Sequence, residues 1–254
     1  MLAKRIYIFL LIMALSFPAF ADRLQDNNVI SWNTSLNTIY LSKRVSFWLE
    51  YQWRREDLLR NCQQSMIRPG IQYHFKNGMS TMAGYGYIIT YAYGDYPPGP
   101  HRIPEHRIFE QLVWNESIGR VTLNHRLRLE QRLMGKVNQK AEEYNVGGWN
   151  YMNRARYQLR ANVPINHKTF TDKTWFASAY DELLIGFGSN VNQSIFDQNR
   201  IGVLVGYQFN KMFKIEGGFI HQTLQQGGLV NGREVIQYNS GAMLNVYFTK
   251  PPRS

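Results

Sequence analysis

The histidines of this sequence are the side chains that could serve as a general base in nucleophilic catalysis. His74, His125 and His221 lie in separate stretches, and His125 has no serine two residues after it. A serine or cysteine hydrolase needs its nucleophile within hydrogen-bond reach of a base that a third group orients. We interpret each histidine as standing alone at an apolar or interfacial position, and we predict no catalytic residue.

Cys62 is the single cysteine, so an intrachain disulfide is excluded. It lies in the polar stretch 60–64, which we predict to be a loop, and no base is found near it in the sequence. No His, Cys, Asp or Glu spacing is typical of a zinc site, and no glycine-rich phosphate loop is found. We therefore predict no metal and no cofactor.

Charged and apolar residues alternate over residues 121–133. Apolar side chains occupy one face of this run, and Arg126, Arg128, Glu130 and Arg132 occupy the other. A two-residue period is the side-chain repeat of a β-strand. Four charges on one face are too many for a dry interface between sheets, so we expect them inside a closed barrel. The full set of candidate inward charges is Glu50, Arg54, Arg68, Arg126, Arg128, Glu130, Arg132, Arg154, Arg156, Arg160, Arg200 and Glu216.

The chain begins with the three parts of a secretory signal. Lys4 and Arg5 come first, residues 6–17 are almost wholly apolar, and Ala19 and Ala21 fit a cleavage site. We predict a signal peptide over 1–21. No later window holds the roughly 18 apolar residues of a membrane helix. If the rest of the chain spans a membrane, it must do so as a closed barrel.

The composition is basic, with 29 Lys and Arg against 18 Asp and Glu. Such a balance can indicate nucleic-acid binding when the cations form a cluster or a tail. Here the arginines are dispersed along the predicted strands. We therefore predict no nucleic-acid partner, and we expect outer-membrane lipid to surround the protein.

From residue 43 the alternation recurs in about ten segments, joined by connections that alternate between short and long. Outer-membrane barrels have short periplasmic turns and long external loops, so we predict an all-β, antiparallel transmembrane β-barrel over 43–248 with both ends periplasmic. A C-terminal tail follows at 249–254. Residues 22–42 could extend the first strand, add a pair to make twelve, or fold into the lumen. The short connections are expected at 76–78, 116–119, 165–173 and 210–211, and the long ones near 56–64, 93–106, 134–147, 186–198 and 223–234.

An ordered set of short motifs resembles a family of uncharacterised Gram-negative outer-membrane β-barrels, a domain of unknown function. The resemblance implies a barrel in the bacterial outer membrane and carries no catalytic residue. The last strand also resembles the signal that the barrel-insertion machinery recognises, through Asn239, Gly241, Leu244 and Val246, and this implies that machinery as a partner. The matching motifs are Gly84-Tyr85-Gly86-Tyr87, Glu110-Gln111, the run ending at Arg132, Arg154-x-Arg156-Tyr157, Asp181-Glu182, Asn199-Arg200 and Gly206-Tyr207.

The inward charges allow two roles for such a barrel. Paired Arg and Glu side chains could plug the lumen and fix strand register, or excess arginine could line a narrow anion-preferring channel. A lipid hydrolase acting from the outer surface is an alternative, although the His-x-Ser-Asn-Gly type of run of barrel lipases is absent. A soluble exported β-sandwich that binds a ligand is a further alternative. The transported solute, if any, and the oligomeric state are not encoded in a recognisable motif.

Overall fold

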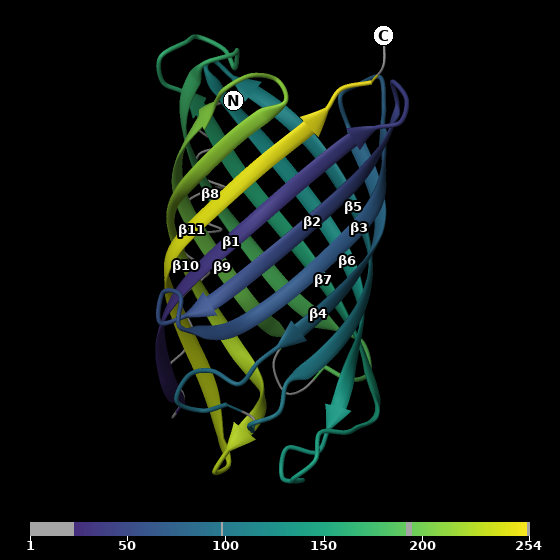
Figure 1. The fold of residues 1–254 in the computed structure, drawn as a ribbon, viewed down its shortest axis with the longest axis vertical. Coiled ribbons are helices and arrows are strands. Elements are labelled where there is room, and N and C mark those ends of the chain that lie inside the picture. The colour runs from purple at the N-terminus through teal and green to yellow at the C-terminus, as the bar shows by residue number, and fades with distance from the viewer. Residues whose placement is uncertain (1–22, 98, 192–194, 253–254) are drawn as a thin grey trace.

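The computed structural model is a closed barrel (Figure 1) and describes residues 23–97, 99–191 and 195–252. The predicted signal peptide lies outside these residues. No helix in the described part of the chain is long and apolar enough to cross a membrane. The strands are β1 (Leu24–Tyr40), β2 (Val45–Glu56), β3 (Asn61–His74), β4 (Ser80–Thr90), β5 (Ile103–Ile118), β6 (Val121–Val137), β7 (Val146–Pro164), β8 (Thr174–Phe187), β9 (Phe196–Gln208), β10 (Phe213–Val230) and β11 (Arg233–Lys250).

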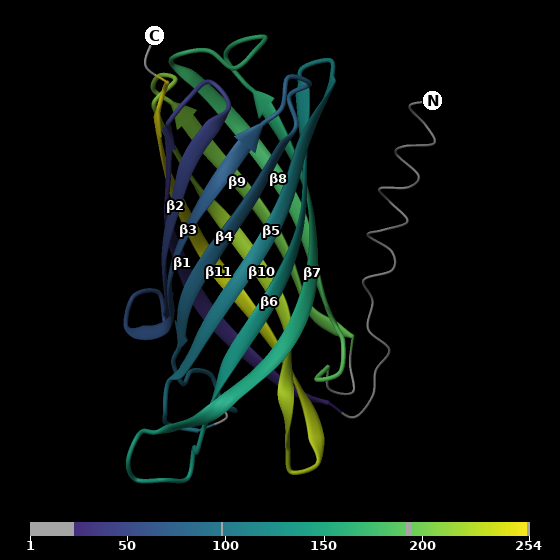
Figure 2. The same ribbon diagram turned by 90° about the vertical axis from the view of Figure 1, so that its right-hand side faces the viewer.

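Each strand pairs with the next in antiparallel fashion, and the barrel closes where β1 pairs with β11 in parallel. This parallel pair runs from Leu24 opposite Val235 to Ile39 opposite Lys250. Figures 1 and 2 show the two strands side by side along the wall. The parallel closure means that Leu24 and Lys250 lie at opposite ends of the barrel.

The eleven strands of the described chain fall between the ten and the twelve expected from the sequence. A barrel in which consecutive strands are antiparallel can close with an antiparallel pair only if the number of strands is even. Here β1 and β11 pair in parallel, so an odd number of strands closes the barrel. The ten strands expected from residue 43 correspond to β2–β11, and their two ends, Val45 and Lys250, lie at the same end of the barrel as predicted, whereas the additional strand β1 starts at the opposite end. Residues 24–40, whose place the sequence left open, form a full strand of the wall. The alternative of an exported β-sandwich is also wrong, because the sheet closes on itself.

The connections alternate between two ends, which we name the turn end and the loop end. The turn end carries residues 41–44, 75–79, 119–120, 165–173 and 209–212. The loop end carries residues 57–60, 91–102, 138–145, 188–195 and 231–232. The longest connection is at the loop end, as expected. The separation by length is incomplete, however, because 165–173 at the turn end is longer than four of the loop-end connections.

Two predicted loops are strands in the structure. The glycine-rich stretch 223–234 is the β10–β11 hairpin, with only Asn231 and Gly232 in the turn. Both have positive φ, as a two-residue type I′ turn requires. The stretch 56–64 contains only a short turn at 57–60, so Cys62 lies in β3 and not in a loop.

Side chains alternate between the lumen and the outside along every strand, and the polar residues go inward. Glu130 and Arg128 are 1% exposed, whereas the outward Leu127 and Leu129 are each 41% exposed. The molecule thus has a charged interior and an apolar exterior, the reverse of a soluble globular protein.

Inward glycines leave the space that aromatic rings occupy on the neighbouring strand. Gly84 is paired with Phe109 and Gly206 with Phe176, and a Cβ on either glycine would lie within 2.4 Å of the opposite ring. Gly202 has the same relation to Tyr180. These pairs pack large rings inside a narrow barrel without displacing the backbone.

The parallel closure can be tested by a disulfide across the β1–β11 pair. Ser35 and Val246 are register partners, and neighbouring strands bring Cα atoms within disulfide range. In a Cys62→Ser background, we expect Ser35→Cys with Val246→Cys to cross-link, with a shift in gel mobility that a reductant reverses. Ser35→Cys with Ser240→Cys, which lie about 20 Å apart along the strand direction, is the matched control. Equal cross-linking of both pairs, or of neither, contradicts the register.

Candidate functional site

The structure places all twelve candidate inward charges in the lumen. Arg126 and Arg160 have side chains that are 25% and 14% exposed, and the other ten residues are buried. Glu105, Arg107 and Glu182, which were not among the predicted inward charges, are also buried there.

Glu130 on β6 is a buried carboxylate that joins both neighbouring strands, β5 and β7. Its Oε1 accepts hydrogen bonds from Arg156 Nη1 at 2.7 Å and Arg107 Nη1 at 3.3 Å. Its Oε2 accepts one from Arg154 Nε at 2.7 Å. Three guanidinium groups from β5 and β7 therefore converge on one buried carboxylate, and this arrangement offsets the desolvation cost of each charge.

Glu182 on β8 is the second point of convergence. Its Oε1 accepts from Arg126 Nη2 at 2.8 Å and from Arg156 Nη2 at 2.7 Å, and its Oε2 accepts from Arg200 Nη1 at 3.2 Å. Arg156 thus joins Glu130 to Glu182.

Glu105 on β5 extends the chain of ion pairs toward the loop end. Its carboxylate contacts Arg107 at 2.6 Å and Arg132 at 2.8 Å. Arg107 also reaches Glu130, so the ion pairs are continuous from β5 to β9. We call this connected set the Arg–Glu belt. Its members are Glu105, Arg107, Arg126, Arg128, Glu130, Arg132, Arg154, Arg156, Glu182 and Arg200.

Glu50 and Glu216 are buried carboxylates that hold arginines outside the belt. Glu50 on β2 pairs with Arg68 on β3. Glu216 on β10 pairs with Arg160 on β7, and it accepts hydrogen bonds from the Tyr247 hydroxyl at 2.6 Å and Asn245 Nδ2 at 2.9 Å.

Apolar side chains fill the lumen beside the charged groups. Trp48, Met82 and Phe109 form one buried cluster. Ile30, Trp32 and Ile220 form another. The Arg128 guanidinium lies over the Phe109 ring at 4.5 Å and donates to Gln111 Oε1, which connects the charged and apolar layers. Ion pairs and packed rings thus both occupy the middle of the barrel.

A cavity of about 850 Å³ lies at the loop end, and we call it the vestibule. Arginines of the belt line it, together with Arg54 and Arg68 and the carboxamides of several glutamines. Register irregularities in the paired strands also concentrate toward this end, at Arg54/Arg55, Gly135/Val137, Leu184/Ile185 and Gln225/Leu229. Irregular pairing at a barrel rim is a common way to widen a mouth or redirect side chains.

The connection 91–102 folds over part of this mouth. The Tyr93 hydroxyl enters the lumen and donates to Gln237 Oε1 at 2.8 Å. Burial raises the pKa of Tyr93 to about 12, so the hydroxyl keeps its proton at neutral pH. Tyr91 and Tyr93 both line the vestibule.

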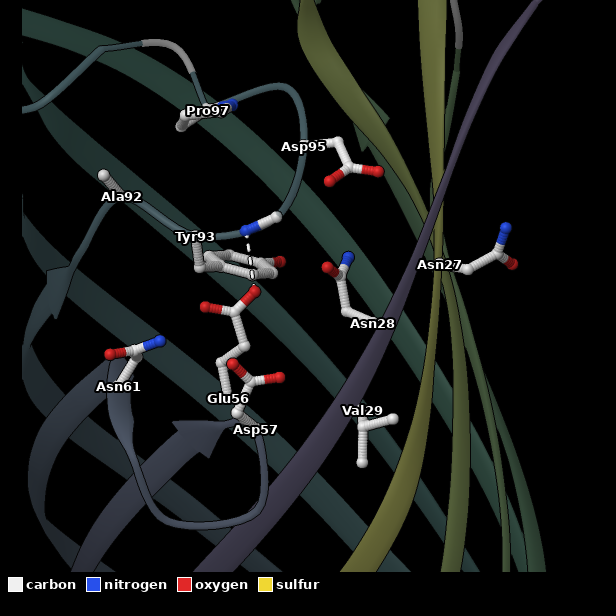
Figure 3. A pocket seen from close by; sticks show the side chains of 11 residues that line it. Asn27, Asn28, Val29, Glu56, Asp57, Asn61, Ala92, Tyr93, Asp95 and Pro97 are labelled. Carbon is white, nitrogen blue, oxygen red and sulfur yellow. Dashed lines mark hydrogen bonds between the residues drawn. The ribbon is translucent and has the colours of Figure 1, made fainter.

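A second, smaller hollow of about 500 Å³ lies between this connection, β1 and the 57–60 turn. Figure 3 shows Glu56 below the backbone of the connection, where its Oε1 accepts a hydrogen bond from Gly94 N at 2.8 Å. Asp57, Asp95, Asn28 and other oxygen-bearing side chains surround it. The Glu56–Gly94 bond anchors the connection to the barrel wall.

The histidines do not stand alone, which corrects the interpretation from the sequence. His74 Nε2 lies 2.9 Å from Ser46 Oγ inside the barrel at the turn end, and His221 Nδ1 lies 2.8 Å from Ser240 Oγ on the outer face. His125 Nδ1 contacts the Tyr157 hydroxyl at 2.8 Å. These serines come from neighbouring strands, so no spacing along the chain could have indicated them. Within the described residues, no three His, Cys, Asp or Glu side chains are grouped as metal ligands.

Adjacent Asp181 and Glu182 on β8 provide a test of the belt, because they point to opposite faces. Glu182→Gln leaves Arg126 and Arg200 without an ion pair and removes one of the two carboxylates that hold Arg156, and we expect a loss of about 3–5 kcal/mol of unfolding free energy. Asp181 is outward and accepts from Asn199 Nδ2 at 2.6 Å, so Asp181→Asn should cost less than about 1 kcal/mol. Urea unfolding in detergent micelles measures both. Similar losses for the two variants would contradict the assignment of faces.

Comparison with known proteins places the chain in a family without an assigned activity. The searches of curated proteins and of solved structures gave no match. One family model, described as "Protein of unknown function (DUF2490)", matches residues 30–232, which run from β1 to the β10–β11 turn and include the whole Arg–Glu belt. Because this match covers more than half of the sequence, the chain belongs to the DUF2490 family of proteins of unknown function.

Proposed function

We propose that this chain is an outer-membrane β-barrel whose lumen is closed, so that it spans the membrane without conducting solutes through its middle. The observation that carries the proposal is the distribution of its side chains. Large apolar groups such as Val203, at 56% exposed, and Ile108, at 57%, face outward, and the buried charges face inward. A soluble protein rarely exposes apolar surface on every side, whereas lipid favours it.

Aromatic side chains at the two ends support a membrane-spanning barrel. At the turn end, Trp175, Tyr207 and Phe209 are in ring contact at 4.9 and 4.7 Å. Toward the loop end, Tyr51 and Trp53 are exposed on the outer face. Tyrosine and tryptophan are favoured where acyl chains meet headgroups.

The two outward carboxylates in mid-strand both have partners. Asp181 accepts from Asn199, and Glu110 Oε2 accepts from Gln131 Nε2 at 3.1 Å. A polar group in hydrocarbon is costly unless it is hydrogen-bonded. These bonds make the outer face compatible with lipid contact.

The belt supports a structural role over the anion-preferring channel that the sequence left open. Glu130 and Glu182 draw arginines of β5, β6, β7 and β9 together across the lumen. Phe109 and Trp48 pack in the same part of the barrel, with ring centroids 6.2 Å apart. In this proposal the two layers close the lumen together, and neither layer closes it alone.

Bilayer recordings and heat-shift electrophoresis test this proposal together. We expect the protein to require detergent for extraction, to change gel mobility on boiling and to give no stable conductance in a planar bilayer. Trp48→Ala with Phe109→Ala removes apolar filling and should give measurable conductance, because the belt alone then spans the opening. Full recovery without detergent would contradict the membrane assignment. Conductance of the unaltered protein would contradict the closed lumen.

A second candidate function, lipid hydrolysis at the outer face, is favoured by the Ser240–His221 contact. The two residues are register partners on β11 and β10, and both side chains are on the lipid-facing surface. A serine hydroxyl beside an imidazole is the core of a nucleophile and its base. The other ring nitrogen lies 3.4 Å from Thr223 Oγ1, where a catalytic triad has a carboxylate or amide.

Phospholipid turnover by the purified protein tests this candidate. If Ser240 is a nucleophile, Ser240→Ala should abolish release of fatty acid from mixed phospholipid and detergent micelles. Ser46→Ala is the matched control, since Ser46 also contacts a histidine but lies inside the barrel. Absence of turnover by the unaltered protein, or equal turnover in the Ser240→Ala variant, removes the hydrolase from consideration.

A further inference from the structure

Arg54 is a buried cation in the vestibule for which the described residues supply no ion pair. It is 6% exposed, and the carboxylates of the belt are held by other arginines. We propose that the vestibule binds a small anion carrying carboxylate or phosphate groups, held by Arg54 and Arg200. This inference goes beyond the proposed function, because binding in detergent requires neither a membrane nor a closed pore.

The Arg54 guanidinium has donors left for a ligand. Its Nε and Nη2 donate to Gln52 Oε1 at 3.0 and 2.7 Å, and its Nη1 donates to Gln64 Oε1 at 3.0 Å. A guanidinium carries five N–H groups, so two remain after these three bonds. Neutral carboxamides hold the side chain in place without cancelling its charge.

Trp32 brings a second cation close to the first. The guanidinium carbon of Arg54 lies 3.6 Å from the Trp32 ring centroid, and that of Arg200 lies 5.1 Å from it. Arg200 shares Glu182 with Arg126 and Arg156, and its buried Nε has no hydrogen-bond partner. The buried Nε of Arg68, which also lines the vestibule, has none either. Arg54, Arg68 and Arg200 thus bring several guanidinium groups to one cavity, and such a cluster favours an anionic ligand.

Neighbouring carboxamides are oriented in a way that also favours an anion. Gln198 Oε1 accepts hydrogen bonds from Arg200 Nη2 and Gln222 Nε2, so the group that Gln198 has left to offer is its Nε2 donor. The cavity of about 850 Å³ is within the usual size range of small-molecule sites. Charge and donors together favour a carboxylate- or phosphate-bearing molecule over a neutral one.

Calorimetric titration of the full-length protein in detergent tests the site. The probes are citrate and tripolyphosphate, with sucrose as the neutral control. We expect saturable binding of at least one anion at millimolar concentration or below, weakened at least tenfold by Arg54→Gln and less by Arg54→Lys, which keeps the charge but loses the planar fork. Arg44→Gln is the matched control, because Arg44 is exposed at the turn end.

Thermal unfolding separates a ligand-binding role for Arg54 from a structural one. A bound anion should raise the midpoint of the unaltered protein and leave that of Arg54→Gln unchanged. Without anion, Arg54→Gln should be at least as stable as the unaltered protein, because an unpaired buried cation is removed. The proposal would be overturned if Arg54→Gln lowered the midpoint of unfolding without anion. It would also be overturned if Arg54→Gln and Arg44→Gln lost equal anion affinity, or if neither anion bound to the unaltered protein or raised its midpoint. Each readout is independent of the bilayer recordings, so the two proposals can fail separately.

Discussion

The constraint on which the rest of this structure depends is that charge enclosed in the lumen must be neutralised there. Glu130 and Glu182 meet this constraint by each holding guanidinium groups from more than one strand. Because side chains alternate with a period of two, a slip of one residue in β6 or β8 would move these carboxylates to the outer face. The ion pairs therefore specify register, and register in turn gives the barrel its apolar exterior.

Space inside a narrow barrel is a second constraint, and the glycines of β4 and β9 relieve it. Gly84, Gly202 and Gly206 each face an aromatic ring on the adjacent strand. Rings in these positions exclude water next to the belt, and a lower local dielectric strengthens each Arg–Glu attraction. Packing and electrostatics thus support each other, since the rings that fill the interior also strengthen the ion pairs beside them.

The period-two pattern predicts the barrel architecture and the inward position of Arg128, Glu130 and Arg156, because each of these features depends only on local alternation. Glu105 lies within the predicted connection 93–106 and Arg107 at its edge, so the alternating Glu105, Arg107, Phe109 face of β5 is not apparent from the sequence. Which of Asp181 and Glu182 faces the lumen depends on Arg156 and Arg200, which belong to other strands. The parallel β1–β11 closure likewise joins residues more than two hundred positions apart, and no local signal encodes it.

The two ends of the lumen differ in how completely their arginines are paired. Toward the turn end, Glu216 receives Arg160, Tyr247 and Asn245, and Trp48 and Phe109 pack tightly. At the loop end, Arg54 donates hydrogen bonds to carboxamides and lies over the Trp32 ring. The Nε atoms of Arg68 and Arg200 have no hydrogen-bond partner. A chain selected for stability alone would replace such a cation with a neutral residue, because an unpaired buried charge costs free energy. Departures of this kind from the rules that stabilise a fold are expected at sites that bind something. The uneven pairing of the same residue type within one barrel is therefore the strongest physical reason to look for a ligand at the loop end.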